Sequence, residues 1–382
     1  MDNKKRQNTP AAKHVIPLLL CIFSTALFSF GCISQEEFQT KTISDNVLLV
    51  THPDLGNQVV VQSDKGLLIF DSFWSETTAR KFKKEISKAT RRDDFAYVID
   101  MVDRLDMIGG NGAYPEAVII GHAYIPTKYK NKGVVDTERT DLIEMWREKE
   151  VLSRKRLEKM EEDSEAGQKE LKWVNKCKNR ADELESGFAM IPPQITYADR
   201  MTLDLGNLTA SLRWFGETGN YRGLTMAVFP EEKLAVLSKS IIFPRSHLAP
   251  YPHPDYKEIN VPRWIGLLEE ILEGDNAVDC ILLSDYEEVI PKDMMLSHLH
   301  YIRKLWNGIK AAVAEGRSLE EIQDQLSLEK DFAFVKDMQV YKNESDAWIH
   351  PQHEVHILHF YRRIKNQLSA SDSQGSERKD ND

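Results

Sequence analysis

The chain has 382 residues, of which 41% are hydrophobic and 29% charged, so it can bury the core of one large domain or two modest ones. This composition excludes a wholly disordered chain. Its 60 acidic residues outnumber its 50 basic residues and give a formal net charge of −10. Because nucleic-acid binding needs a basic face that displaces counterions, we expect no nucleic-acid partner.

The first 31 residues have the pattern of an export signal. Basic residues precede an apolar run over 15–30, which is shorter than the ~20 residues that a membrane-spanning helix needs. The segment Ser29-Phe30-Gly31-Cys32 resembles the lipobox of bacterial lipoproteins, in which the cysteine is lipidated after cleavage. We therefore expect residues 1–31 to be a signal peptide and Cys32 to anchor the exported chain to a membrane of the cell envelope. An ordinary cleaved signal and an uncleaved anchor are the alternatives.

The first part of the chain alternates short strands with a helix. Glu76–Lys88 has helical periodicity, and Ser75 precedes it as a possible N-cap. Short apolar or β-branched runs predict strands over 46–50, 58–62, 67–70, 97–99 and 117–120. This alternation is typical of an α/β layered fold.

The segment over 129–185 is rich in Lys, Arg and Glu. Hydrophobic residues such as Leu142, Met145 and Trp146 recur in it at helical spacing, which predicts long amphipathic helices. We interpret it as a helical insertion with one face packed against the protein. A helical arm that binds a partner is the alternative.

Strands return in the second half, followed by helices. Apolar runs predict strands over 201–205, 208–215, 224–229, 234–238 and 279–283, and helices over 262–272, 294–314 and 350–368. Ser318 and Glu321 form a capping box that opens another helix. We therefore expect residues 291–368 to be a helical extension and the polar tail over 369–382 to be disordered.

Short motifs follow one another in a characteristic order, among them GLLIFD (66–71), DMIGGN (106–111), LDLG (203–206), GNYRG (219–223) and FPEEK (229–233). Their order and spacing resemble the metallo-β-lactamase superfamily. The resemblance implies an αββα sandwich over residues 32–290, with two sheets, helices outside them and a metal site at one edge of the sheets.

In that superfamily a run His-x-His-x-Asp-His precedes the paired glycines, and a third histidine, a bridging aspartate and a last histidine come later. These side chains hold one or two zinc ions, which activate a water molecule. Counting back from Gly109-Gly110, the run falls on Val102, Arg104, Asp106 and Met107. The later positions fall on Asn220 with Tyr221, on Lys239 or Ser240, and on Asp285 or Tyr286.

Only Asp106 keeps the residue type of a zinc ligand. Valine and methionine offer no hard donor, arginine has no lone pair to give, and the ammonium of Lys239 repels a cation. We therefore expect the zinc site to be lost and no cofactor to replace it. Our hypothesis is that Arg104 and Lys239 form ion pairs with Asp106, and with Asp103 or Asp285, in place of coordination bonds. The alternative is that both cations point to solvent.

Other side chains allow two interpretations each. His122 could face the site as a base, or it could be a hydrogen-bonded structural residue. Cys177 and Cys280 could form a disulfide or remain free thiols. Four histidines recur at every third position, namely His350, His353, His356 and His359. Two of them could share a helix face and bind a metal, or the run could be a partly packed helix.

These features favour an exported, lipid-anchored protein that binds an unidentified small molecule or protein and has no catalytic role. The alternative is a hydrolase of ester, thioester or lactam substrates with a rebuilt, oxygen-rich site. That site would use Asp103, Asp106 and Asp285 with His122, and Asp106 and Asp285 would hold a harder ion such as Mg²⁺ or Ca²⁺. A third possibility is a structural lipoprotein whose arm over 129–185 binds a partner.

Overall fold

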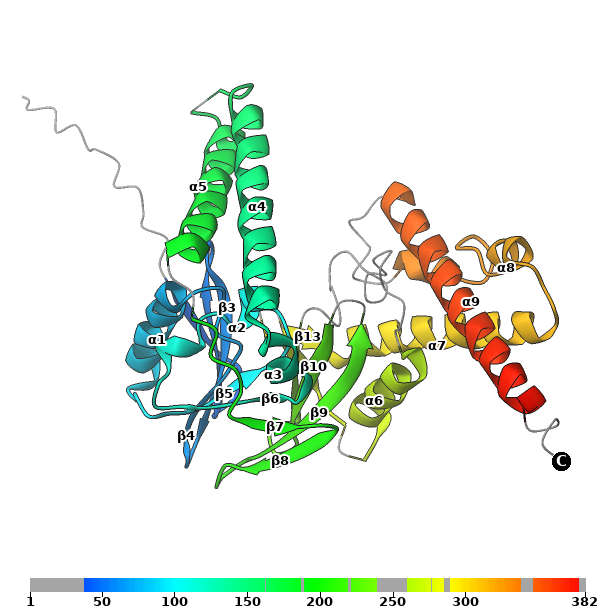
Figure 1. Ribbon diagram of the computed structural model, residues 1–382, viewed down its shortest axis with the longest axis horizontal. Helices are drawn as coiled ribbons and strands as arrows, with labels where there is room; N and C mark the ends of the chain where they lie inside the picture. Colours follow the sequence, from blue (N-terminus) through cyan, green and yellow to red (C-terminus); the bar gives the residue numbers. More distant parts are fainter. Residues whose placement is uncertain are drawn as a thin grey trace, which may run out of the picture. The chain divides into compact units, whose positions relative to one another are not determined.

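The computed structural model describes residues 38–161, 163–186, 189–218, 221–238, 260–275, 277–284, 289–337 and 346–377 (Figure 1). All of them belong to one compact unit that begins at Phe38. In this described part, no helix combines the length and apolar character needed to cross a bilayer.

The first sheet has seven strands in sequence order. They are β1 (Gln39–Thr42), β2 (Val47–His52), β3 (Gly56–Ser63), β4 (Gly66–Phe70), β5 (Phe95–Asp100), β6 (Val118–His122) and β7 (Ile195–Tyr197). Neighbours from β1 to β4 pair antiparallel, and neighbours from β4 to β7 pair parallel. Helix α1 (Glu76–Thr90) connects β4 to β5, and its predicted N-cap is confirmed because the Ser75 side chain accepts from the Thr78 N–H.

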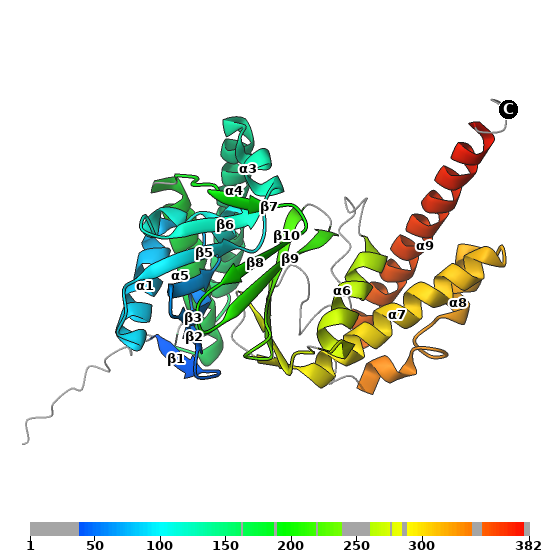
Figure 2. The same ribbon diagram turned by 90° about the horizontal axis from the view of Figure 1, so that it is seen from below.

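The second sheet has the order β13-β12-β11-β10-β9-β8. Its strands are β8 (Arg200–Asp204), β9 (Thr209–Thr218), β10 (Tyr221–Phe229), β11 (Leu234–Leu237), β12 (Cys280–Leu283) and β13 (Val289–Pro291). One apolar core joins the two sheets, and in it the rings of Phe70 and Phe229 meet edge to face with centroids 6.0 Å apart. Figures 1 and 2 show α1 outside the first sheet and α6 (Val261–Glu273) outside the second. The predicted αββα sandwich is therefore confirmed.

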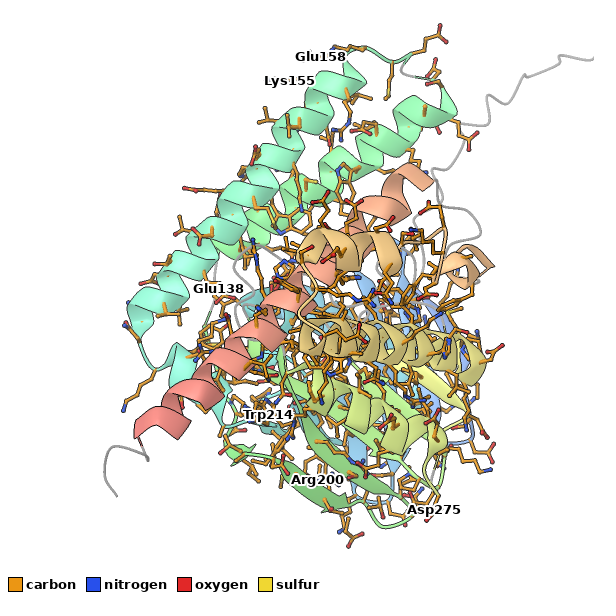
Figure 3. All side chains as sticks on the ribbon, turned by 90° about the vertical axis from the view of Figure 1, so that its right-hand side faces the viewer. Glu138, Lys155, Glu158, Arg200, Trp214 and Asp275 are labelled. Atoms are coloured by element: carbon orange, nitrogen blue, oxygen red, sulfur yellow. The ribbon has the colours of Figure 1, made fainter. Side chains whose placement is uncertain are left out.

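The insertion is helical, as predicted, and its two long helices form a hairpin. After the short α3 (Tyr124–Tyr129), α4 (Lys132–Leu157) and α5 (Glu165–Ser186) run side by side (Figure 1). Figure 3 shows Glu138 near the base of this hairpin and Lys155 and Glu158 at its far end. The α5 residues Cys177, Ala181 and Leu184 join the core between the first sheet and α1, so the insertion is part of the packed body.

The C-terminal helices are α7 (Lys292–Ala314), α8 (Leu319–Gln325) and α9 (Asp346–Glu377). They share a core with α6 and the outer face of the second sheet. The capping box at Ser318 is present. Helix α9 continues to Glu377, inside the tail that we expected to be disordered, because extending a formed helix adds a hydrogen bond for each residue fixed.

Candidate functional site

The segment that aligns with the metal-binding run follows β5 and leads into two short helices, α2 (Leu105–Ile108) and η1 (Asn111–Ala113). The Ser72 N–H donates to the Met107 carbonyl at 2.6 Å, and the Gly110 N–H donates to the Phe73 carbonyl at 3.1 Å. A Cβ at Gly110 would lie 2.0 Å from the Ser72 carbonyl oxygen, so only glycine fits there. The aligned positions are therefore held firmly against the end of β4.

The first and last positions of the run carry apolar side chains. Val102 is fully buried in the core under the second sheet. Met107 is 8% exposed and lines a small cavity together with Phe73 and Trp74. Neither side chain offers the nitrogen or oxygen donor that zinc binding at these positions requires.

Arg104 and Asp106 form a bidentate ion pair. Arg104 Nε donates to Asp106 Oδ1 at 2.9 Å, and Arg104 Nη2 donates to Asp106 Oδ2 at 2.5 Å. The side chains are 22% and 16% exposed, so water screens this pair only in part. The Arg104 guanidinium also lies 5.1 Å from the ring centre of Tyr221. Both oxygens of the one aspartate kept from the family's ligand set are thus engaged by a cation.

Asp103 points to a different set of partners. Its buried carboxylate accepts from the N–H groups of Arg222 (3.0 Å) and Gly223 (2.8 Å) through Oδ1. Lys128 Nζ of α3 lies 3.5 Å from Oδ2, so the structure pairs Asp103 with a residue that sequence reasoning missed. Burial raises the pKa of Asp103, whereas Lys128 and the backbone N–H groups act to lower it.

Lys128 also belongs to a polar network that fixes the start of α2. Its Nζ lies 3.1 Å from a carboxylate oxygen of Glu138, and the Leu105 N–H donates to the same side chain at 3.1 Å. The Tyr129 hydroxyl donates to the Asp103 carbonyl at 2.8 Å. Burial and the neighbouring carboxylate of Glu138 raise the pKa of Tyr129. The base of the insertion therefore orients the segment that carries Arg104 and Asp106.

An open groove of about 840 Å³ lies beside this pair. Charged groups on its wall come from Arg104, Asp106, Lys128 and Glu138, and Tyr221 adds an aromatic ring. One stripe of α4 forms the other wall with both polar and apolar side chains, namely Val134, Thr137, Asp141, Leu142 and Met145. We call this cavity the Arg104 groove.

Behind the pair the space is nearly filled. The remaining cavity is about 70 Å³, and Arg180 of α5 is one of the residues that line it. The Arg180 guanidinium lies 4.1 Å from the ring centre of Trp74 and 4.6 Å from that of Trp146. Such stacking stabilises a guanidinium between two aromatic rings. The helical insertion thus supplies an arginine and a tryptophan that close the aligned site from behind.

His122 has the structural role that was one of its two interpretations. Its Nε2 is 2.9 Å from the Ala198 carbonyl oxygen, and its Nδ1 accepts from the Tyr124 N–H at 3.2 Å. The imidazole stacks on Trp214 with centroids 5.2 Å apart, and burial lowers its pKa. Both ring nitrogens of His122 therefore have partners within the protein.

Two members of the histidine run of α9, His353 and His356, pack inside the protein. Nδ1 of His353 and Nδ1 of His356 lie 3.0 and 3.1 Å from the Tyr301 hydroxyl, and both imidazoles are buried. The thiols Cys177 and Cys280 are free and belong to different cores. Among the residues with described positions, no three His, Cys, Asp or Glu side chains are grouped to hold a metal ion.

Several predicted site residues fall outside the described part of the chain, namely Asn220, Lys239, Ser240, Asp285, Tyr286 and the lipidation site Cys32. The donor set at the described positions does not fit zinc. Val102 is buried in an apolar core, Arg104 brings a positive charge, and Asp106 has both oxygens engaged.

Scans with protein-family models and a search of curated proteins found no match. Among solved structures, the chain is similar to the inverting sec-alkylsulfatase Pisa1 from Pseudomonas sp., with a TM-score of 0.55 and 12% identity over 85% of this chain and 50% of that chain. A double mutant of the same enzyme gives a TM-score of 0.53 and 13% identity over the same shares. A metallo-β-lactamase from Pontibacter korlensis gives a TM-score of 0.43 and 11% sequence identity over 70% of this chain and 99% of that chain.

The chain spans about half the length of the alkylsulfatase chains that it resembles. At this level of identity the likeness concerns the fold. Two mixed sheets packed face to face, the helices outside them and the likeness to the solved structures agree on one architecture. The chain therefore has the metallo-β-lactamase fold, with a helical insertion and C-terminal helices.

Proposed function

We propose that this protein is a non-catalytic binding or scaffold module built on the metallo-β-lactamase fold. The observation that carries the proposal is the pair of Arg104 and Asp106, in which one guanidinium engages both oxygens of the aspartate that relatives give to the metal site. Val102 and Met107 on either side offer no replacement ligand. The ion pair takes over the electrostatic role of the cation without supplying a Lewis acid or an activated water molecule.

The Arg104 groove is the place where we propose that a ligand binds. Its volume of about 840 Å³ lies within the range of roughly 300–1,000 Å³ that is usual for small-molecule sites. Lys128 and Glu138 are already fixed by hydrogen bonds, so a ligand would meet polar groups that need little reordering. The apolar side chains of α4 in the groove, Val134, Leu142 and Met145, supply the surface that a partly apolar ligand would cover.

The hydrolase alternative requires free oxygen ligands and a base. Asp103 and Asp106 are each engaged by a cation, and both ring nitrogens of His122 have partners. These contacts favour the binding role over a rebuilt Mg²⁺ or Ca²⁺ site.

Metal analysis of the purified protein at neutral pH, combined with esterase, thioesterase and β-lactam hydrolysis assays, separates the two functions. We expect no stoichiometric metal and no turnover. Stoichiometric metal together with a turnover that Asp106→Ala abolishes would overturn the binding proposal.

Ligand binding in the groove is tested by a fragment library in thermal-shift assays. Thr137→Trp fills the groove, and Glu144→Trp places the same bulk on an exposed position of α4 outside the groove. We expect fragments whose stabilising effect is lost in Thr137→Trp and kept in Glu144→Trp. Fragments that respond equally to both variants would place binding elsewhere.

We also propose that residues 1–31 direct export and that Cys32 carries a lipid, on the basis of the signal pattern and the lipobox resemblance. Metabolic labelling with palmitate in a bacterial host tests this. We expect incorporation that Cys32→Ser abolishes and Cys21→Ser leaves unchanged. Equal labelling of the two variants would contradict lipidation at Cys32.

A further inference from the structure

Lys149 of α4 is a partly buried lysine that contacts an aromatic ring. Its Nζ lies 4.4 Å from the ring centre of Trp146, which is 6% exposed. Its neighbours one helical turn away include no acidic residue, since they are Met145, Trp146, Leu152 and Ser153. Among the residues with described side chains, no carboxylate lies within ion-pair distance of this ammonium. Lys149 therefore lacks the partner that usually stabilises a partly buried lysine in its charged form.

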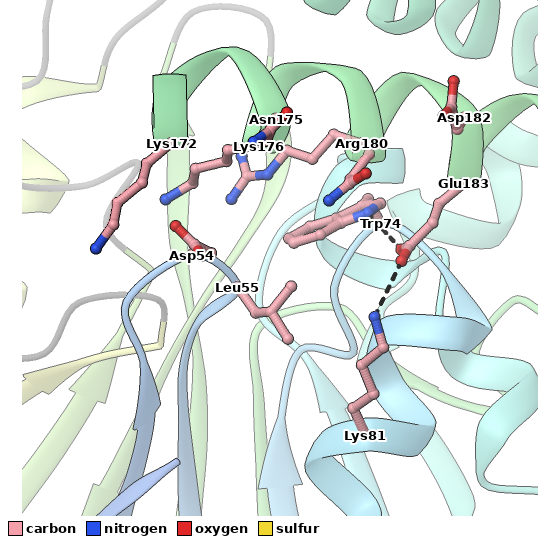
Figure 4. Close-up of a pocket in the computed structure, with 11 residues that line it drawn as sticks. Asp54, Leu55, Trp74, Lys81, Lys172, Asn175, Lys176, Arg180, Asp182 and Glu183 are labelled. Carbon is pink, nitrogen blue, oxygen red and sulfur yellow. Dashed lines mark hydrogen bonds and ion pairs between the residues drawn. The ribbon is translucent and has the colours of Figure 1, made fainter. Parts of the chain in front are cut away.

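A second cation lies on the same indole. The Arg180 guanidinium of α5 is 4.6 Å from the ring centre of Trp146 and 4.1 Å from that of Trp74, beside which Figure 4 shows it. Glu150 follows Lys149 in the sequence, but its carboxylate pairs with two arginines of α4, at 3.1 and 2.7 Å. The nearest acidic residue in the sequence on this side is thus bound by other cations, while a positive charge shares the ring with Lys149.

These surroundings favour the neutral amine of Lys149. Burial lowers its pKa, and the positive charges of Arg180 and Arg104 act in the same direction. Cys177 and Asp106 act in the opposite direction without reversing the shift. Because only the neutral amine has a free lone pair, a lysine that is desolvated beside other cations is an activated nucleophile.

Lys149 lies at one end of the Arg104 groove. The residues of α4 that line the groove recur at helical spacing as far as Met145, and Lys149 follows one turn later. Side chains on a helix lean toward its N-terminus, so the side chain of Lys149 extends back toward the turn that carries Met145. Its contact with Trp146, three residues earlier, agrees with this direction.

We propose that Lys149 forms a reversible imine with a small apolar aldehyde held in the Arg104 groove. This inference rests on the binding function proposed for the groove. The lone pair of the amine forms a C–N bond with the carbonyl carbon, the carbonyl oxygen takes up a proton, and the nitrogen loses one. Loss of water from this carbinolamine leaves a C=N bond, so the step needs neither an oxidant nor a reductant.

An aldehyde suits this site better than an activated acyl group. Water hydrolyses an imine back to the amine and the aldehyde, so the attachment stays reversible, as a binding module requires. An acyl group would instead form a stable amide and block the lysine. The apolar side chains Val134, Leu142 and Met145 in the groove supply the surface that covers the alkyl chain of the aldehyde.

Reductive alkylation of the full chain with hexanal and sodium cyanoborohydride at neutral pH tests the proposal. The reductant converts an imine into a stable hexylamine, which peptide mass spectrometry locates. Lys155 is the internal control, because it is an exposed lysine of the same helix outside the groove. We expect Lys149 to be alkylated several-fold faster than Lys155 and the adduct to be lost in Lys149→Arg. Equal rates at the two lysines would overturn the proposal.

Two variants of α4 test whether the groove holds the aldehyde. Asp141→Trp places an indole on the groove wall about two turns before Lys149, whereas Glu144→Trp makes the same change of charge and bulk at an exposed position outside it. We expect the hexanal rate at Lys149 to fall several-fold in Asp141→Trp and to be kept in Glu144→Trp. An equal response to both variants would overturn binding of the aldehyde in the groove. Circular dichroism confirms that each variant is folded.

Formaldehyde has no alkyl chain and therefore reports on the amine alone. We expect it to alkylate Lys149 faster than Lys155 in both tryptophan variants, and equal rates would contradict an activated amine. The proposed function is judged separately, by metal content, turnover and the binding of fragments. A slow Lys149 would therefore overturn the imine without overturning the binding module, whereas turnover would overturn the module without changing the alkylation.

Discussion

The guanidinium of Arg104 is bound side-on to the carboxylate of Asp106 through two hydrogen bonds of 2.9 and 2.5 Å. Only Leu105 separates the two residues in the sequence. Both belong to the run whose sequence resembles the metal-binding run of the fold family. An aspartate that is only 16% exposed would destabilise the fold if it lacked a partner. The arginine therefore supplies the compensating charge that this partly buried carboxylate requires.

Replacing Arg104 with alanine tests the energetic weight of this pair. We expect Arg104→Ala to lower the free energy of unfolding by about 1–3 kcal/mol, because Asp106 is left partly buried without its cation. Arg104→Met combined with Asp106→Leu should recover most of that loss, since neither charge then remains. Urea denaturation followed by fluorescence gives these values.

The control for this measurement is Arg80→Ala. Arg80 is 60% exposed and pairs with Glu76 one helical turn away, so its loss should cost less than about 0.5 kcal/mol. If Arg104→Ala were as mild as Arg80→Ala, the pair would have no structural importance and Asp106 would need no compensating cation.

Much of the fold could be predicted because its strands are buried. The runs over 58–62 and 67–70 lie in strands that are almost fully buried, and such strands appear in sequence as continuous apolar segments. The missed strand β1 (Gln39–Thr42) is polar and exposed along its whole length. The missed strands β7 and β13 have three residues each, which is too short for a periodic signal.

The site could be predicted only where a motif fixed the alignment. Gly109-Gly110 located Arg104 and Asp106, which the structure brings together. Arg180 lies in the charged segment over 129–185, and Lys128 immediately precedes it. Both were missed because a basic side chain that enters the interior cannot be told in sequence from one that points to water. The aromatic residues Trp146 and Tyr129 in that charged segment were the available signal that one side of it is buried.

The double variant Arg104→His with Met107→His restores two of the family's histidines, and we expect it to bind no stoichiometric zinc. Val102 still occupies the first position of the metal-binding run, and its side chain is fully buried. The adjoining cavity has a volume of only about 70 Å³, because Arg180, Trp74 and Trp146 occupy the space around it. The measurement is metal content after incubation with zinc and dialysis, with wild type in parallel. Tight zinc binding by a folded double variant would show that the site still accommodates the metal.

Asp100 predicts a pH dependence of stability that does not involve the groove. Burial, and then the nearby carboxylate of Asp71, raise the pKa of Asp100 well above its usual 3.8. The folded protein therefore holds this proton over a pH range in which the unfolded chain has lost it, so stability falls as pH rises from about 4 through the folded pKa.

Asp100→Asn removes this titration and can keep the contact with Asn111 Nδ2 through its side-chain oxygen. We expect the variant to be more stable than wild type at pH 8 and to show a flatter stability profile between pH 4 and pH 8. Asp94→Asn is the control, because Arg92 lowers the pKa of that exposed carboxyl and its loss should bring no gain at pH 8. A parallel profile for Asp100→Asn and wild type would show that Asp100 has no raised pKa.

A chain of hydrogen bonds through Tyr301 of α7 connects α7 with α9. Nε2 of His353 lies 2.6 Å from the Leu326 carbonyl and must carry a proton there, so in the neutral imidazole Nδ1 accepts from the Tyr301 hydroxyl. The phenolic oxygen then accepts from Nδ1 of His356. Tyr301→Phe removes this partner from both buried imidazoles, and we expect it to lower the free energy of unfolding by about 1–3 kcal/mol and to speed amide hydrogen exchange in α9. Tyr361→Phe, within α9 itself, should change neither quantity, and equal effects of the two substitutions would show that the histidines do not hold α9 in place.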